Sequence, residues 1–152
     1  MPNDLSPPND PSIPDGEFLY HRVYPDLHCI FIDPASKEPR PSSAAFRSKR
    51  KEPLSVELAS LTTPEESRSR APKPDFYLAR VQAGEVRGPG CECGIVKDPE
   101  TNNKAHALLY GRGEGGALTK GQREKIAQRA RFEIVDEQAV MTARLLAAGE
   151  EG

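Results

Sequence analysis

The feature that most restricts how this chain can fold is its high content of proline and glycine. The 152 residues include 15 prolines and 12 glycines, and both residue types interrupt regular helices and strands. They leave only short uninterrupted stretches before Gly121. We therefore expect a fold assembled from short elements.

The overall composition indicates one soluble domain without a general affinity for polyanions. Hydrophobic residues make up 36% of the chain, charged residues 29%, and the net charge is -2, which favours neither nucleic acid nor an anionic membrane as a partner. The sequence has no apolar run of transmembrane length and no signal-peptide pattern at its start. Three cysteines fit a reducing compartment better than a disulfide scaffold. We expect a cytoplasmic protein.

The chain divides into three regions by composition. Residues 1–16 contain five prolines and five Asn or Asp residues, which predicts a disordered leader because so few apolar groups can offset the cost of ordering it. Residues 17–110 carry the strand-like segments and form the sheet-based core. Residues 111–152 begin with a glycine-rich hinge and continue as two helices packed on the same domain.

Short strands alternate with turn residues through the core. In the segment 54–58, alternation places Leu54, Val56 and Leu58 inward and Ser55 and Glu57 outward. Capping patterns predict helices that begin after Thr63, after Thr119 and after Asp136, the last with Met141, Leu145 and Ala148 along one face. The expected strands are 18–24, 29–33, 43–46, 54–58, 76–81, 95–97 and 106–110. The pattern predicts an α+β fold, with a small mixed or mainly antiparallel sheet and the C-terminal helices on one face.

One run, Arg40-Pro41-Ser42-Ser43-Ala44-Ala45-Phe46, contains two adjacent hydroxyls beside a guanidinium group. Arginine offers a planar fork of donors to a phosphate or carboxylate, and serine adds short adaptable ones. The alternative is that both serines are ordinary turn residues after Pro41. We expect an anion-binding cleft formed by Arg22, Arg40, Ser42, Ser43 and His106.

His106 has two interpretations of its own. Its side chain titrates near neutral pH, so it is a candidate general base at the end of a loop. The alternative is a histidine that only hydrogen-bonds a loop carbonyl. No partner for catalysis is visible in the sequence.

Several short runs occur in a fixed order between Phe18 and Arg131: Leu19-Tyr20-His21-Arg22, the run from Arg40 to Phe46, Leu54-Ser55-Val56, Asp98-Pro99 and Ala105-His106-Ala107. Together they resemble a family of small, uncharacterised bacterial proteins. The resemblance implies a bacterial source and one compact domain, and it implies no mechanism.

A second resemblance is to the ADP-ribosyltransferase fold, which grips NAD with an early basic residue, a serine or tyrosine, and a later glutamate. In this chain Arg22 or His21, Ser42 or Ser43, and Glu57 follow that order. The Glu-x-Glu pattern of the catalytic strand is missing. The likeness is therefore one of fold only.

Other motifs are incomplete. Cys91 and Cys93 have only one residue between them, closer than the spacing of a zinc knuckle. The glycines from 111 to 116 match a dinucleotide-binding motif, but too little chain follows to complete such a sheet. The basic residues of the helix after Thr119 do not form one stripe, so nucleic-acid binding is not expected. We expect neither a metal nor a cofactor.

These observations favour a non-enzymatic binding or accessory protein of the bacterial cytoplasm, with a polar anion-binding cleft. Its partner would be another protein or a small anionic ligand. The alternative is a small enzyme, ADP-ribosyltransferase-like, that acts on an NAD-like or phosphorylated substrate with the same residues.

Overall fold

A computed structural model describes residues 6–48 and 50–151. Its main element is a six-stranded sheet in which every pair of neighbouring strands is antiparallel. In spatial order the strands are β6 (Gly94–Lys97), β7 (His106–Tyr110), β4 (Leu54–Leu58), β1 (Phe18–Val23), β5 (Tyr77–Gln82) and β8 (Arg131–Ile134). The expected α+β class with a mainly antiparallel sheet is confirmed.

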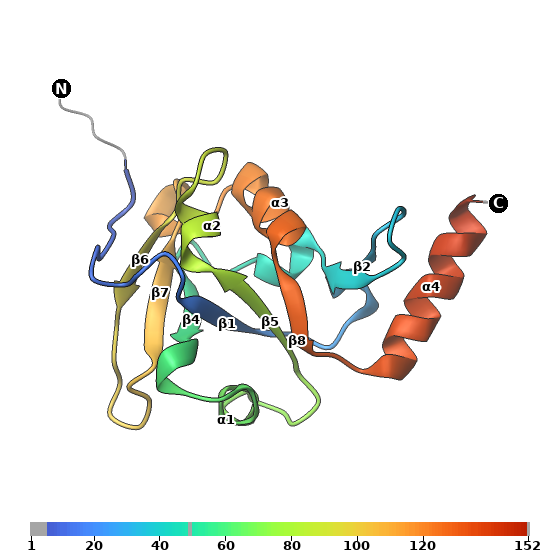
Figure 1. Cartoon of the computed structure of the whole chain (residues 1–152), viewed down its shortest axis with the longest axis horizontal. Coiled ribbons are helices and arrows are strands. Elements are labelled where there is room, and N and C mark those ends of the chain that lie inside the picture. The colour runs from blue at the N-terminus through green and yellow to red at the C-terminus, as the bar shows by residue number, and fades with distance from the viewer. Residues whose placement is uncertain (1–5, 49, 152) are drawn as a thin grey trace.

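One face of this sheet, which we call the apolar face, carries the main core. On β1, Leu19 and Val23 point to it and are fully buried. The 3₁₀ helix η2 (Ser43–Phe46) and helix α3 (Lys120–Arg129) cover this face with Phe46 and Ile126, which are equally buried. Helix α3 and η2 pack against each other, and Figure 1 shows α3 on the upper side of the sheet. Removing such side chains from water supplies most of the stability of the domain.

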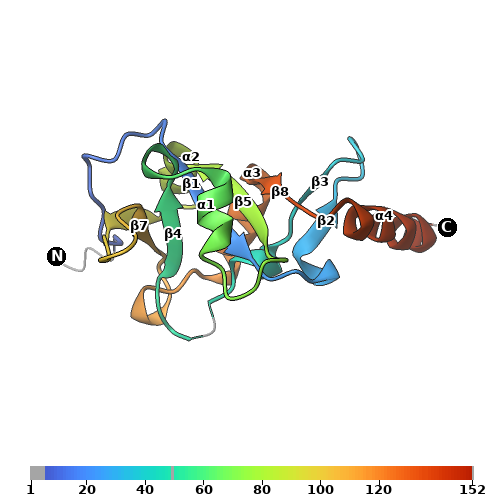
Figure 2. The same cartoon turned by 90° about the horizontal axis from the view of Figure 1, so that it is seen from below.

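The opposite face, which we call the polar face, carries Tyr20, Arg22, Glu57 and His106. Glu57 is the direct cross-strand partner of both Tyr20 and His106, so these three side chains point the same way. Arg22 follows Tyr20 by two residues on β1 and shares its face. Helix α1 (Pro64–Ser69) lies on this side, away from α3, as Figures 1 and 2 show.

A second, two-stranded sheet pairs β2 (Ile30–Ile32) with β3 (Pro39–Pro41). The C-terminal helix α4 (Glu137–Glu151) packs against β2 and projects at one end of the molecule (Figure 2). It contacts the domain through buried Val140 and Ala143. The row that contains Met141 and Leu145 is instead exposed, at 55% and 74%, so the face expected from the sequence is not the packed one.

The remaining short elements are η1 (Leu27–Cys29), η3 (Ala59–Leu61), α2 (Ala83–Arg87) and η4 (Glu114–Gly116). The expected caps at Thr63 and Thr119 are confirmed, since each hydroxyl accepts a hydrogen bond from the backbone three residues later. One predicted strand was wrong, because 43–46 is a 3₁₀ helix, and strands β3 and β8 were not predicted. Within the described residues, no helix is long and apolar enough to cross a membrane.

The segment before β1 is attached to the domain by Arg87. Its guanidinium donates to the Asp10 and Ile13 carbonyls and to the Asp15 carboxylate, and Ile13 is 1% exposed. Residues 1–5 lie outside the described residues. For residues 10–15 the structure differs from the disordered leader that we expected, because an arginine far along the chain satisfies the backbone of this proline-rich segment.

Candidate functional site

The most unusual group on the polar face is the carboxylate of Glu57, which is buried near the end of β4. Arg22 Nη1 donates to Oε2 at 2.6 Å, and Arg70 Nη1 donates to Oε1 at 2.7 Å. Asn103 Nδ2 also donates to Oε2, at 2.7 Å. A buried charge is tolerated only when it is paired in this way. We call these four residues the Glu57 cluster.

Each member of the Glu57 cluster comes from a different element. Arg22 lies on β1, the antiparallel neighbour of β4. Arg70 follows the last turn of α1 and caps it, so its side chain reaches back to the sheet. Asn103 lies in the connection between β6 and β7, where its backbone pairs with Glu100 and its Oδ1 accepts from the Ala105 amide. The sheet, the helix and the hairpin turn therefore meet at one carboxylate.

Burial by itself raises the pKa of Glu57, because it disfavours the charged form. The nearby Ser67 hydroxyl, the hydrogen bonds from Arg22 and Asn103, and the charge of Arg22 outweigh burial and hold the pKa below its ordinary value. Ser67 Oγ is fully buried near the carboxylate, without a partner at good hydrogen-bonding geometry among the described residues. Glu57 is therefore ionised at neutral pH and fixes both arginines in place.

An open cleft of about 580 Å³ lies beside the Glu57 cluster. The arginine side chains at its wall remain partly exposed, 23% for Arg22 and 28% for Arg70. Glu66 Oε2 lies 3.8 Å from Arg70 Nη2 at the rim. The lining residues are Arg22, Arg70, Glu100, Thr101, Asn102 and Asn103.

Both arginines bond to Glu57 through Nη1 alone. Among the described residues, Nε and Nη2 of Arg22 have no protein partner within hydrogen-bonding distance. A guanidinium group that is held at one edge can present its other edge to a ligand. Because its side chain is already ordered, binding costs little further conformational entropy. Arg22, Arg70 and Glu57 together carry one positive charge, and the exposed carboxylate of Glu100 also lines the cleft.

His106 shares the polar face with Arg22 but does not line the cleft. Its Nδ1 lies 2.9 Å from the Asp98 carbonyl oxygen and 3.1 Å from Asp98 Oδ2. Both neighbours are acceptors, so Nδ1 carries a proton and donates it. This geometry fits the alternative of a histidine that hydrogen-bonds a loop carbonyl and closes the β6–β7 hairpin.

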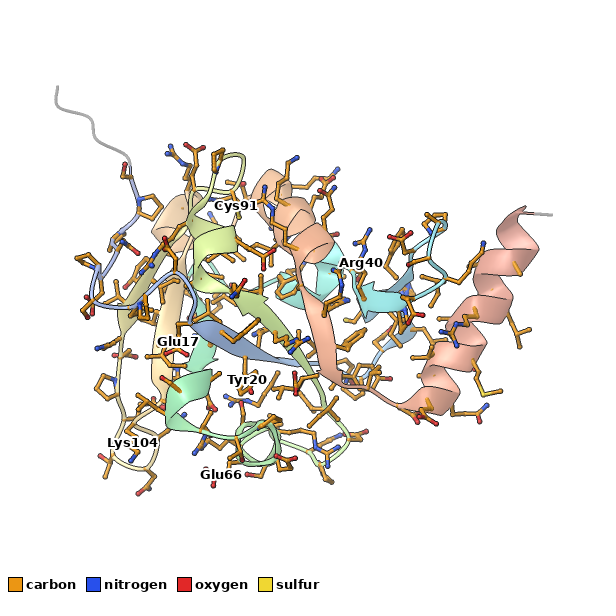
Figure 3. All side chains as sticks on the ribbon, in the orientation of Figure 1. Glu17, Tyr20, Arg40, Glu66, Cys91 and Lys104 are labelled. Atoms are coloured by element: carbon orange, nitrogen blue, oxygen red, sulfur yellow. The ribbon has the colours of Figure 1, made fainter. Side chains whose placement is uncertain are left out.

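The other sequence-predicted site residues lie on the far side of the sheet. Arg40 Nη1 donates to the Ala127 carbonyl of α3 at 3.0 Å, and its guanidinium stacks 4.4 Å from the Phe31 ring centroid. Ser42 Oγ donates to the His28 carbonyl, and Ser43 begins η2. Figure 3 shows Arg40 beside α3, whereas Tyr20 and Glu66 lie on the side of α1.

The structure therefore does not bring Arg22, Arg40, Ser42, Ser43 and His106 into one cleft. The reason is that residues 43–46 turn into a 3₁₀ helix that packs Phe46 on the apolar face, so the preceding residues go to that side. Arg22 and His106 alone share a face. The cleft beside Arg22 is completed by Arg70 and Asn103, neither of which was predicted from the sequence.

A signal for these residues was present but weak. Glu57 occupies the outward face of a strand, as alternation predicts, and is nevertheless buried by α1 and the β6–β7 turn. The arginine-rich end of α1 supplies the opposite charge. A carboxylate in a strand next to such a helix is a candidate buried ion pair.

The structure agrees with the ADP-ribosyltransferase resemblance in one contact and disagrees with it in another. Arg22 and Glu57 do meet, but Ser42 and Ser43 lie across the sheet from them. Both oxygens of Glu57 are already held by donors, which leaves it poorly placed to act on a substrate.

The part of the chain that the structure describes contains no group of three or more His, Cys, Asp or Glu side chains that could hold a metal ion. No family model, no curated protein and no solved structure matches this chain.

Proposed function

We propose that this protein is a non-enzymatic binding protein of the bacterial cytoplasm, and that it holds a small anionic group in the cleft beside the Glu57 cluster. The observation that carries the proposal is the pair Arg22 and Arg70, both fixed by one buried carboxylate and both partly exposed at the same opening. Pre-oriented guanidinium groups are the common protein device for phosphate and carboxylate recognition.

The rest of the lining fits a small polar ligand. Thr101 and Asn102 add side chains that both donate and accept hydrogen bonds. Glu66 is 63% exposed, so solvent screens its charge far more than that of buried Glu57. The exposed Glu100 carboxylate lines the cleft and is screened in the same way, so the two guanidinium groups suit a group with one or two negative charges better than a polyanion.

A direct test is titration of the full chain with inorganic phosphate, AMP and NAD in an isothermal titration calorimeter. We expect Arg70→Gln to weaken binding about tenfold or more, because it removes a charge-assisted donor worth roughly 1.5 kcal/mol or more. Arg22 and Asn103 still pair with Glu57 in this variant, so the fold is retained.

Arg40→Gln is the matched control, since it removes the same charge on the other side of the sheet and should leave affinity unchanged. Equal loss in both variants, or no binding of any of the three probes at millimolar concentration, would overturn the proposal. Cleavage of NAD during the titration would favour the enzyme alternative instead.

A further inference from the structure

A pair of buried sulfur atoms lies far from the Glu57 cluster, in the turn between α2 and β6. Cys91 and Cys93 are 1% and 5% exposed, and their Sγ atoms are 3.6 Å apart. Figure 3 shows Cys91 next to α2 and α3. Nothing in the Glu57 cluster or its cleft uses these thiols.

The backbone brings the two sulfur atoms together. Glu92, between them, has a φ of 57°, in the left-handed region that residues other than glycine rarely adopt. Gly90 just before has a φ of 85°. A strained conformation of this kind persists only where surrounding contacts impose it, and such sites often have a function.

The two thiols differ in acidity. The pKa of Cys91 lies below its ordinary value, because the Cys93 thiol donates to it and because Arg129 and Lys125 are near, although burial opposes the change. The pKa of Cys93 is raised, first because it serves as that donor and then by burial. The lower pKa therefore assigns the first attack to Cys91 rather than to Cys93.

Cys29 provides an internal comparison. It is also buried, at 7% exposure, and burial raises its pKa to about 11. The structure records no sulfur within bonding reach of it among the described residues.

We propose that Cys91 and Cys93 form a reversible redox modification site, in which a peroxide converts the two thiols into an intramolecular disulfide. The Cys91 thiolate attacks a peroxide oxygen and the O–O bond breaks; with hydrogen peroxide this gives a sulfenic acid and hydroxide, which takes up the proton that the Cys91 thiol released and becomes one water. Cys93 sulfur then attacks Cys91 sulfur, the S–O bond breaks, and a second water leaves. Two thiols are oxidised and one peroxide is reduced to two waters.

The same geometry makes this disulfide easy to reduce. The sulfur atoms must close from 3.6 Å to about 2.05 Å, around a ring that contains only one intervening residue. Such a short loop gains little stability from cross-linking, and strained disulfides are the labile, regulatory ones. The disulfide is therefore a reversible modification rather than a structural cross-link.

Closure of the bond also acts on α3. Gln122 Nε2 donates to the Cys91 carbonyl at 2.7 Å. Gln122 Oε1 accepts from the backbone amides of Arg112 and Thr119. Movement of Cys91 is transmitted to the residue that closes the first turn of α3.

The test uses hydrogen peroxide on the full chain, followed by alkylation, trypsin digestion and mass spectrometry. Cys91 and Cys93 fall in one tryptic peptide, Gly88 to Lys97. We expect this peptide to lose two hydrogens and both of its alkylation sites. The loss should be at least about tenfold faster than the loss of alkylation at Cys29, and dithiothreitol should restore both thiols.

Cys93→Ala should abolish the disulfide and drive Cys91 toward sulfinic acid or an intermolecular bond, while Cys29→Ala should leave the peptide chemistry unchanged. The proposal is overturned if both thiols stay alkylatable, if they react no faster than Cys29, or if the wild-type pair passes irreversibly to sulfinic acids. Zinc recovered in equal amount with the purified protein and released by blocking Cys91 would also overturn it.

Discussion

The two faces of strand β1 are stabilised by different forces, although their residues alternate along one short segment. Leu19 and Val23 enter an apolar core closed by Phe46 and Ile126, where stability follows mainly the apolar area that is buried. Arg22 points the other way, to a buried carboxylate whose stability depends on ionisation and on every donor around it. The apolar face sets the fold, and the polar face supplies groups that a ligand can use.

The largest expected effect is on the apolar face. Phe46→Ala should lower the free energy of unfolding by about 3–5 kcal/mol, because it leaves a cavity beneath η2 and α3. Urea denaturation measures the loss. A change below about 1 kcal/mol would mean that η2 does not close the core.

The next effect is on the polar face. Glu57→Ala should cost about 2–3 kcal/mol, less than the loss expected for a fully buried pair, because Arg22 and Arg70 can each turn toward solvent. A further Arg22→Ala change should then cost little, since its partner is already gone. Additive losses in this double-mutant cycle would contradict a direct interaction.

The third effect depends on pH and involves His21, which points to the apolar face. Its Nδ1 and Nε2 lie 3.0 Å and 2.9 Å from the carbonyls of Ser55 and Ala45. Burial, with a smaller contribution from Arg22, lowers its pKa, although the two carbonyl contacts oppose this change.

The folded state therefore binds fewer protons than the unfolded state at mildly acidic pH. The contribution of His21 to stability is present above pH about 6.5 and is lost as the pH falls below it, by at most about 1.4 kcal/mol per pH unit. Chemical denaturation between pH 7 and pH 5 measures the slope, which should be shallower in His21→Phe. An equal slope in both proteins would assign the effect to other groups.

The smallest effect is expected on the outer row of α4. Met141→Ala and Leu145→Ala should each change the unfolding free energy by less than about 0.5 kcal/mol, because both side chains are mostly exposed. Val140→Ala is the matched control on the packed row and should cost more. A large loss of unfolding free energy in Leu145→Ala would show that another surface covers the outer row of α4 in solution.

Local patterns were sufficient to predict much of the fold. Alternation in Leu54 to Leu58 and the caps at Thr63 and Thr119 are decided by neighbouring residues, and they were predicted correctly. Strand β8, from Arg131 to Ile134, was missed because it is short and its pairing with β5 is a long-range contact. The run from Ser43 to Phe46 suits a strand or a helical turn equally, and the packing of Phe46 decides between them.

The candidate site was less predictable, because it depends on which face each residue occupies. A shift of one residue moves a side chain to the other side of a sheet, so the placement of Arg40 and Ser42 followed from the conformation of η2. Arg70 and Asn103 reach Glu57 from a helix end and a turn. No spacing pattern in the sequence predicts that these side chains converge on Glu57.

The most direct test of the account is to map, by backbone amide chemical shifts, where inorganic phosphate binds the full chain. We expect saturable shifts at Arg70 and at residues 100–103 around the cleft, with residues 40–43 unchanged. Shifts confined to residues 40–43, or shifts spread evenly over all basic residues, would contradict the claim that the polar face holds the site.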